Sequence, residues 1–113
     1  MMNAPSLIEI GTTDTAATHR FMAALFGWTF EAFGPEGEGW FASPTLRIGM
    51  NGRDPEPGLV VFFAVPDLDA AMAQVRALGG TTEEPSPWEP GFGRFCTCRD
   101  PAGLRFGLQQ PAV

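Results

Sequence analysis

Hydrophobic residues along this chain recur first with the spacing of a strand and then with the spacing of a helix. This order occurs twice. Apolar runs at 7–11 and 59–65 are typical of short buried strands. Each run leads into an aspartate, Asp14 or Asp67, whose side chain can bind the free backbone N–H groups at the start of a helix. Each helical stretch then runs into glycine, a common helix terminator. The pattern predicts a strand followed by a helix in each half.

The spacing of apolar residues within the two helical stretches predicts which face of each helix is buried. In the first helix, over about 15–26, one stripe collects Ala17, Phe21, Ala24 and Leu25. In the second helix, the shared face holds Leu68, Ala71, Met72, Val75 and Leu78. His19, the only histidine, lies opposite the first stripe, so we expect it to face solvent rather than to act in catalysis.

Short strands and turns follow each helix. The expected strands are 28–33, 40–42 and 45–50 in the first half, and 81–84, 93–98 and 104–109 in the second. A polar connector, 51–58, joins the halves but is too short to separate two domains. The two halves close on one motif, Leu46-Arg47-Ile48-Gly49-Met50 and Leu104-Arg105-Phe106-Gly107-Leu108. This repeat predicts a duplicated β-α-β-β-β unit within one domain of residues 1–113, with module one at about 6–52 and module two at about 58–110.

Composition narrows the classes of function. The chain has 113 residues, 44% of them hydrophobic, which is enough for the core of one domain. Its net charge is -6, with seven arginines and no lysine, which disfavours nucleic acid and anionic membranes as partners. We expect neither a membrane span nor a signal peptide. Cys96 and Cys98 share one face of a strand and are poorly placed to bridge each other, which indicates small core residues in a reduced, cytoplasmic protein.

Several segments together carry a resemblance to a known family. They are Phe21-Met22 and Leu25-Phe26-Gly27-Trp28 after Asp14; Phe63-Ala64-Val65-Pro66-Asp67-Leu68-Asp69-Ala70-Ala71; Arg76-Ala77-Leu78-Gly79-Gly80; and Asp100-Pro101-Ala102-Gly103 before Phe106-Gly107-Leu108. In this order, over about 6–110, they resemble the vicinal oxygen chelate superfamily, which includes glyoxalase I, extradiol dioxygenases, fosfomycin-resistance proteins and bleomycin-binding proteins. The resemblance implies an α+β fold in which two βαβββ modules form a curled-sheet cup. It also implies a homodimer, because many short members build the cup from two chains.

The resemblance further implies where metal ligands would lie, on the first and last strands of each module. In this chain those positions hold residues that cannot coordinate: Leu7, Gly49, Val60 and Gly107. A shift of two residues along the strands would bring in Glu9 and Gln109. Their partners at the same offset would be Asn51 and Phe62, which make a poor ligand set. We therefore expect no metal and no other cofactor.

Glu9 and two arginines are the charged candidates for a ligand site. Strand alternation places Glu9 on the face that lines the cup if the family's register holds. There its carboxylate would bind a cationic group or act as a base, or it would pair with Arg47 or Arg105. The arginines would suit an anionic ligand group through their planar guanidinium, or they would form surface ion pairs of little energetic weight. The sequence leaves these alternatives open.

Aromatic residues supply the apolar part of the expected site. Trp88 and Phe92 lie on or beside a proline-rich loop, where a tryptophan suits stacking on a flat or cationic ligand. The alternative for Trp88 is a hydrophobic edge or a dimer contact. The full set of expected ligand-binding residues is Glu9, Trp40, Arg47, Phe62, Trp88, Phe92, Arg105 and Gln109.

The sequence thus favours a metal-independent protein that binds a small molecule. The resemblance implies a role similar to the bleomycin-resistance branch, which sequesters its ligand, so no residue is assigned to catalysis. The alternative is a glyoxalase- or lyase-type enzyme with a non-standard site in which Glu9 is the base. A regulatory or structural module without a ligand is a third hypothesis.

Overall fold

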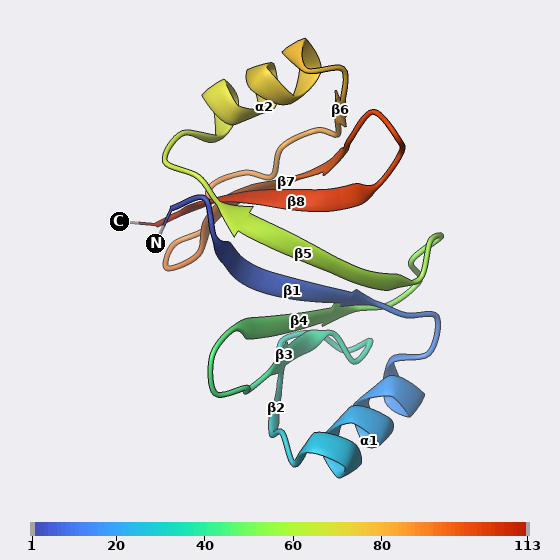
Figure 1. The fold of residues 1–113 in the computed structure, drawn as a ribbon. Coiled ribbons are helices and arrows are strands. Elements are labelled where there is room, and N and C mark those ends of the chain that lie inside the picture. Colours follow the sequence, from blue (N-terminus) through green and yellow to red (C-terminus); the bar gives the residue numbers. More distant parts are fainter. Residues whose placement is uncertain (1, 113) are drawn as a thin grey trace. The chain divides into compact units, whose positions relative to one another are not determined.

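The computed structural model describes residues 2–112, which form two compact units (Figure 1). The N-terminal unit is Leu7–Val60, and the C-terminal unit joins residues 2–6 to 61–112. The elements of the first half are β1 (Pro5–Gly11), α1 (Thr15–Phe26), β2 (Phe30–Ala32), β3 (Gly39–Phe41) and β4 (Arg47–Asn51). Those of the second half are β5 (Gly58–Ala64), α2 (Leu68–Ala77), β6 (Thr81–Thr82), β7 (Gly93–Arg99) and β8 (Arg105–Pro111). The predicted α+β class and the twofold βαβββ order are confirmed.

The four strands of each half pair in the same way. In the first half, β1 lies parallel to β4, and β3 lies antiparallel to both β2 and β4. In the second half, β5 lies parallel to β8, and β7 lies antiparallel to both β6 and β8. The parallel pairs place Glu9 opposite Gly49 and Phe62 opposite Gly107. The repeat seen in the sequence is therefore also a repeat in strand register.

Each helix begins at the predicted aspartate. The Asp14 side chain accepts a hydrogen bond from the backbone N–H of Ala17 at 3.0 Å, and Asp67 accepts one from Ala70 at the same distance. These bonds satisfy donors that have no partner within the first turn of a helix. At its other end α1 stops at Gly27, whose φ of 71° is a left-handed conformation that glycine adopts without strain.

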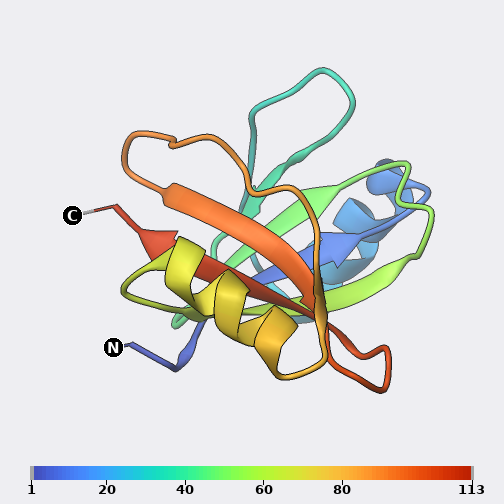
Figure 2. The same cartoon turned by 90° about the horizontal axis from the view of Figure 1, so that it is seen from above.

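In the C-terminal unit, α2 lies over one face of the strands, as Figure 2 shows. The core between helix and strands consists of Val65, Leu68, Met72, Cys96, Cys98 and Leu108. The two cysteines are buried and free, as the sequence predicts. Leu78, expected on the same helix face, is instead 70% exposed, because α2 ends one residue before it at Ala77.

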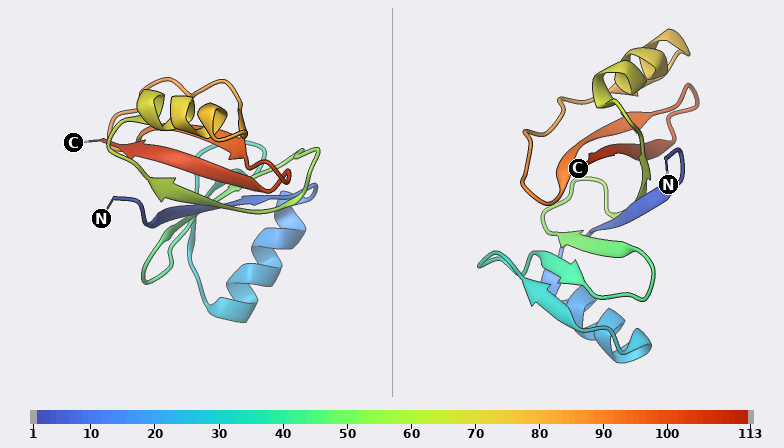
Figure 3. Two further views of the ribbon diagram at one scale, coloured as in Figure 1. Left: turned by 45° about the horizontal axis from the view of Figure 1, so that its top comes forward. Right: turned by 90° about the vertical axis from the view of Figure 1, so that its left-hand side faces the viewer.

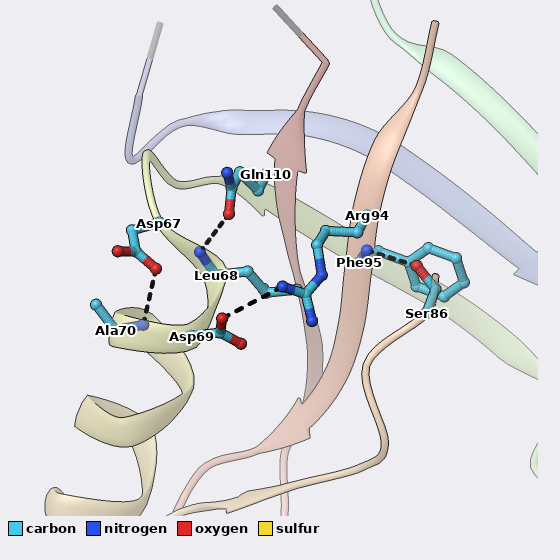
Figure 4. Close-up of polar contacts among 8 residues, drawn as sticks. All are labelled: Asp67, Leu68, Asp69, Ala70, Ser86, Arg94, Phe95 and Gln110. Carbon is cyan, nitrogen blue, oxygen red and sulfur yellow. Dashed lines mark hydrogen bonds and ion pairs between the residues drawn. The ribbon is translucent and has the colours of Figure 1, made fainter. Parts of the chain in front are cut away.

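Polar contacts tie the start of α2 to its sheet (Figure 4). The backbone N–H of Leu68 donates to the side-chain oxygen of Gln110 at 2.8 Å, and the Arg94 guanidinium pairs with Asp69 at 3.4 Å. Gln110 belongs to β8 and Arg94 to β7, so both contacts reach from a strand to the first turn of the helix. They join the start of the helix to the two strands beside it.

In the N-terminal unit, α1 lies on one side of the strands (Figure 3). The residues that it packs on them are not the predicted ones. Met22 packs on the core, and the ring of His19 lies 4.4 Å from that of Phe30. Phe21 and Leu25 are 62% and 59% exposed. The predicted stripe and the solvent-facing histidine are therefore wrong. Apolar residues surround this helix on nearly every side, so their spacing did not select a face; the sheet did.

The sheet face that receives α1 is strongly aromatic. Its core consists of Ile10, Phe41, Ile48 and Met50, with Ile8, Trp28 and Phe30 packed around them. The Trp28 ring stacks on Phe26 at 4.4 Å and lies 5.8 Å from Phe41. Trp28 thus packs on the core just before β2, and that strand, Phe30–Ala32, is shorter than the expected 28–33. Among residues 2–112, no helix has the length and apolarity needed to span a bilayer.

Candidate functional site

The strands of each unit have one face that packs on the helix of that unit and one face turned away from it, which we call the helix-free face. On β1, Ile10 enters the core with α1, so alternation turns Glu9 to the helix-free face. On β8, Leu108 enters the core with α2, and Gln109 is turned away in the same sense. The strand residues predicted to bind a ligand lie on these helix-free faces.

The carboxylate of Glu9 occupies a notch left by Gly49, its partner across the two parallel strands. A Cβ atom on Gly49 would lie 2.8 Å from Glu9 Oε2 and 2.9 Å from Cζ3 of Trp40. Both distances are shorter than real Cβ contacts, so the space exists only because residue 49 has no side chain. Gly49 therefore brings the carboxylate and the indole edge together. The sequence pattern marked Gly49 only as a missing metal ligand; its pairing with Glu9 required the register.

Burial raises the pKa of Glu9 to about 7. A hydrogen bond from Asn51 acts in the opposite direction, and the carboxylates of Asp54 and Glu38 raise the pKa further. At neutral pH the side chain is therefore divided between its acid and its carboxylate form. It can donate a hydrogen bond in one form and accept one in the other. In the sequence, Asn51 entered only as a member of a poor metal-ligand set and Asp54 had no role, because both come close to Glu9 only through the pairing of β1 with β4 and the turn after β4.

A hollow of about 620 Å³ lies beside β2, β3 and β4. Trp40 and Arg47 line it, and the guanidinium carbon of Arg47 lies 4.6 Å from the centre of the indole ring. This is a cation–π contact, and Arg47 itself is exposed. The volume is that of a typical small-molecule pocket. Trp40 connects the two features, because it lines the hollow and its Cζ3 atom lies at the Gly49 notch that the Glu9 carboxylate occupies.

In the C-terminal unit the position equivalent to Glu9 is held by Phe62. Its ring occupies the space that a side chain on Gly107 would need. Phe62 is 3% exposed, and its ring meets that of Phe95 edge-on at 5.7 Å. One half of the repeat thus has a titratable carboxylate beside an indole, and the other half has a packed phenyl ring.

Gln109 is buried and has partners at both ends of its amide. Its oxygen accepts a hydrogen bond from the Ser6 hydroxyl at 2.7 Å, and its nitrogen donates to the backbone carbonyl of Phe92 at 3.1 Å. The Phe92 ring also lies 5.9 Å from Phe95. The structure therefore gathers Phe62, Phe92 and Gln109 around Phe95. Ligand binding by these three residues stays a prediction, and their visible role is packing.

The remaining two candidates lie at the surface of the C-terminal unit or near it. Trp88 is 53% exposed on the loop before β7. Arg105 begins β8, where it pairs in register with Arg99. Their roles in ligand binding stay predictions. Of the predicted residues, the structure brings together Glu9, Trp40 and Arg47, which all belong to the N-terminal unit.

The donor set does not fit the metal site that the superfamily implies. Leu7 and Val60 present buried hydrocarbon at two of the four ligand positions. At the other two, Gly49 and Gly107, the space for a ligating side chain is taken by Glu9 with Trp40 and by Phe62. Within residues 2–112, no three His, Cys, Asp or Glu side chains gather closely enough to hold a metal ion. Divalent metals in proteins require several such donors.

The curated relatives that this chain matches in sequence are longer than the chain itself. Residues 7–109 match the model of the glyoxalase-like domain family. The chain is 28% identical to the anthracycline biosynthesis protein DnrV of Streptomyces peucetius, over 97% of this chain and 48% of that protein. It is 31% identical to "Putative glyoxylase CFP32" of Mycobacterium bovis, over 94% of this chain and 45% of that protein. This chain therefore spans about half the length of these relatives.

Solved structures share the fold at lower sequence identity. Methylmalonyl-CoA epimerase from Mycobacterium tuberculosis has a TM-score of 0.65 at 18% identity, over 99% of this chain and 90% of that chain. Homoprotocatechuate 2,3-dioxygenase from Brevibacterium fuscum has a TM-score of 0.68 at 22% identity, over 100% of this chain and 39% of that chain. The match to the glyoxalase-like domain family confirms the resemblance to the vicinal oxygen chelate superfamily, and these solved structures show the same fold. The chain belongs to the glyoxalase-like domain family.

Proposed function

We propose that this protein binds a flat small molecule with a negative charge, without a metal, in the hollow beside Trp40 and Arg47. The observation that carries the proposal is the Arg47 guanidinium lying over the Trp40 indole at the wall of this hollow. An indole offers a flat apolar surface, and a guanidinium offers paired N–H donors to a carboxylate or phenolate. Together they suit an aromatic ring system that carries one anionic group.

The name of one relative supports the flat part of this ligand. DnrV is named as an anthracycline biosynthesis protein, and anthracyclines are built on several fused aromatic rings that carry phenol groups. A volume of about 620 Å³ is in keeping with a ligand of a few fused rings. We extend to this chain only the ligand class, a flat and conjugated molecule, and leave its further decoration open.

A fluorescence titration tests the proposal. The probe is anthraquinone-2-carboxylate, and the matched uncharged ligand is 2-methylanthraquinone. We expect saturable quenching of tryptophan emission by the carboxylate and clearly weaker binding of the uncharged ligand. Arg47→Ala should cost about 1.5–3 kcal/mol in binding the carboxylate, because a hydrogen bond to a charged group is lost. Trp40→Phe should reduce both the quenching and the affinity.

Arg20→Ala is the matched control, because Arg20 is an exposed arginine on α1, in the same unit. It should bind both ligands as the unchanged protein does. Equal affinity of Arg47→Ala and the unchanged protein for the carboxylate would contradict the proposed site. Absence of any saturable binding would contradict the proposed function.

We further propose that two copies of this chain associate through the outward face of α1. Phe21 and Leu25 expose most of their side chains there, and burial of each would stabilise a contact by about 1.5–3 kcal/mol. The relatives are about twice as long as this chain, so a dimer of this chain would have about the length of one relative. Sedimentation equilibrium should give a dimer that the double change Phe21→Ser and Leu25→Ser dissociates. Leu104→Ser, at an equally exposed leucine elsewhere, is the control; a monomeric unchanged protein would refute the proposal.

A further inference from the structure

We infer that Cys96 and Cys98 form a binding site for Cu(I), with the thioether of Met72 as the third donor. The two cysteines lie on β7 and belong to the core that α2 covers, and Met72, on α2, packs in the same core. Soft sulfur donors of this kind select Cu(I) over ions that prefer oxygen or nitrogen. The site belongs to the C-terminal unit and shares no residue with the hollow of the N-terminal unit, so it does not depend on the function proposed above.

The first support is the distance between the two thiol sulfurs. Cys98 Sγ lies 3.9 Å from Cys96 Sγ, and both residues are buried and free. This distance is almost twice the length of a disulfide bond, which is about 2.05 Å. Metal–sulfur bonds of about 2.3 Å at trigonal angles would instead hold two sulfurs about 4 Å apart. An ion between the sulfurs therefore fits a gap that a disulfide would have to close.

The second support is the third sulfur in the same core. Residues two apart on a strand point to one face, so Cys96 and Cys98 both face α2, where Met72 is 7% exposed. The remaining side chains of this core are hydrocarbon, so no oxygen or nitrogen ligand competes there. Methionine combines a flexible side chain with a polarisable sulfur, which lets it adjust to a soft ion. The core thus holds the three sulfur donors of a trigonal Cu(I) site.

The proton and charge balance of binding is set by the two thiols. Each S–H bond breaks as a Cu–S bond forms, and both protons pass to solvent. Two neutral thiols and one monovalent cation thereby become a complex with one negative charge. Of the charged groups that act on both thiols, Arg76 favours this negative charge and Glu83 opposes it, and both are exposed. Their effects oppose each other, so the affinity rests on the sulfur donors.

The edge of the sheet offers the ion a route to the buried sulfurs. The Cys96 thiol donates a hydrogen bond to the backbone carbonyl of Glu83 at 3.1 Å. Glu83 and Glu84 are exposed and follow β6, which has only two residues, so the thiol lies directly beneath a surface segment. Short edge elements with few buried contacts open at a small fraction of the free energy of global unfolding. Opening of this segment would expose Cys96 while the rest of the core stays packed.

Competition with a coloured Cu(I) chelate tests the site. Under anaerobic conditions the reduced protein is added to the violet complex of Cu(I) with bicinchoninate, whose absorbance falls as the protein removes the ion. We expect one Cu(I) to be bound per chain. Copper X-ray absorption should then show sulfur neighbours at about 2.3 Å. Failure of the protein to take Cu(I) from the chelate would overturn the inference, and so would a shell of nitrogen and oxygen neighbours.

Single substitutions assign the three donors. Cys96→Ala and Cys98→Ala should each weaken Cu(I) binding by more than about 100-fold, because loss of a ligand exceeds the 10–100-fold cost of losing a supporting residue. Met72→Leu keeps the size of an apolar side chain and should weaken binding by about 10-fold. Met50→Leu is the matched control, because Met50 is equally enclosed but belongs to the core of the N-terminal unit. Equal binding by the two leucine variants would remove Met72 from the site, and binding that survives the loss of both cysteines would overturn the inference.

A stability measurement separates binding by the folded protein from capture by the unfolded chain. A ligand of the folded state raises the midpoint of urea denaturation, whereas a ligand that prefers the unfolded chain lowers it. We expect Cu(I) to raise the midpoint of the unchanged protein and to leave that of the double variant Cys96→Ala and Cys98→Ala where it is. A midpoint that Cu(I) lowers would mean that only the unfolded chain offers its thiols, and the inferred site would be refuted.

Discussion

The ring of Phe62 fills the space that a side chain at Gly107 would need. Gly107→Ala should therefore force the ring and its neighbours to move, at a cost of about 1–3 kcal/mol in the free energy of unfolding. Gly49→Ala should also destabilise, because its Cβ would meet the Glu9 carboxylate and Trp40. Urea denaturation of each variant measures the loss.

Gly34→Ala is the matched control for these two glycines. A Cβ at Gly34 would meet the flexible end of Glu38, Oε1 at 3.3 Å, and would lie in ordinary contact with its Cβ at 3.9 Å. We expect a change within about 0.5 kcal/mol for this variant. Equal stability of all three variants would show that the packing of Phe62 and Glu9 does not require glycine at positions 107 and 49.

The raised pKa of Glu9 predicts a defined dependence of stability on pH. The ordinary pKa of this side chain is 4.5, and its pKa in the folded protein is about 7. Between these values the folded protein holds a proton that the unfolded chain has released, so the free energy of unfolding falls as the pH rises. The stabilising contribution of Glu9 to the free energy of unfolding is fully present below pH 4.5 and is lost above pH 7. We expect a loss of about 2 kcal/mol, allowing for the remaining solvent contact.

Glu9→Gln removes this dependence. Its stability relative to the unchanged protein should rise by about 2 kcal/mol from acid to slightly alkaline pH, as measured by urea denaturation at a series of pH values. Glu84→Gln should keep a constant difference from the unchanged protein over the same range. A constant difference for Glu9→Gln as well would mean that the folded protein does not raise the pKa of Glu9.

His19 should contribute to stability, because its ring lies against the core and not in solvent. It is 4.4 Å from the ring of Phe30 and 5.9 Å from that of Phe41. Such aromatic pairs contribute about 0.5–1.5 kcal/mol beyond the area that they bury. His19→Ala should therefore lower the midpoint of urea denaturation, whereas Arg20→Ala, at the next and exposed position, should leave it nearly unchanged. Similar midpoints for both variants would restore the predicted orientation of α1.

Gln109 should behave as a structural residue whose two hydrogen bonds join distant parts of the C-terminal unit. Gln109→Leu removes the hydrogen bonds that Gln109 makes with the Ser6 hydroxyl and the Phe92 carbonyl. Each group keeps a longer bond, from Ser6 to the Phe62 carbonyl at 3.5 Å and from the Ala112 N–H to the Phe92 carbonyl at 3.3 Å. We expect a loss of about 1–3 kcal/mol in the free energy of unfolding, because two hydrogen bonds of a buried side chain are lost. Ser6→Ala should cost less in Gln109→Leu than in the unchanged protein, since its bond to Gln109 is already absent. A Gln109→Leu protein of unchanged stability would favour the alternative role in ligand binding.

The sequence by itself determined the order of elements and the two helix starts. Asp14 and Asp67 act through bonds to backbone groups three residues away, so their role is local and visible in the sequence. Strand alternation is also local, and it puts Glu9 on the opposite face of β1 from Ile10, which packs in the core under α1. The repeat of Gly49 and Gly107 was visible as well, but only as a pair of positions without metal donors.

Only the tertiary structure decided what fills those positions and which face of α1 is buried. The register of β1 with β4 brings the Glu9 carboxylate into the Gly49 notch, and that of β5 with β8 brings Phe62 over Gly107. These contacts join residues about 40 positions apart, so no local pattern contains them. On α1, apolar residues lie all round the helix, and the aromatic sheet face selects Met22. Contacts over long separations in sequence thus decided the chemistry of the site, because they set which groups lose water and which charges meet.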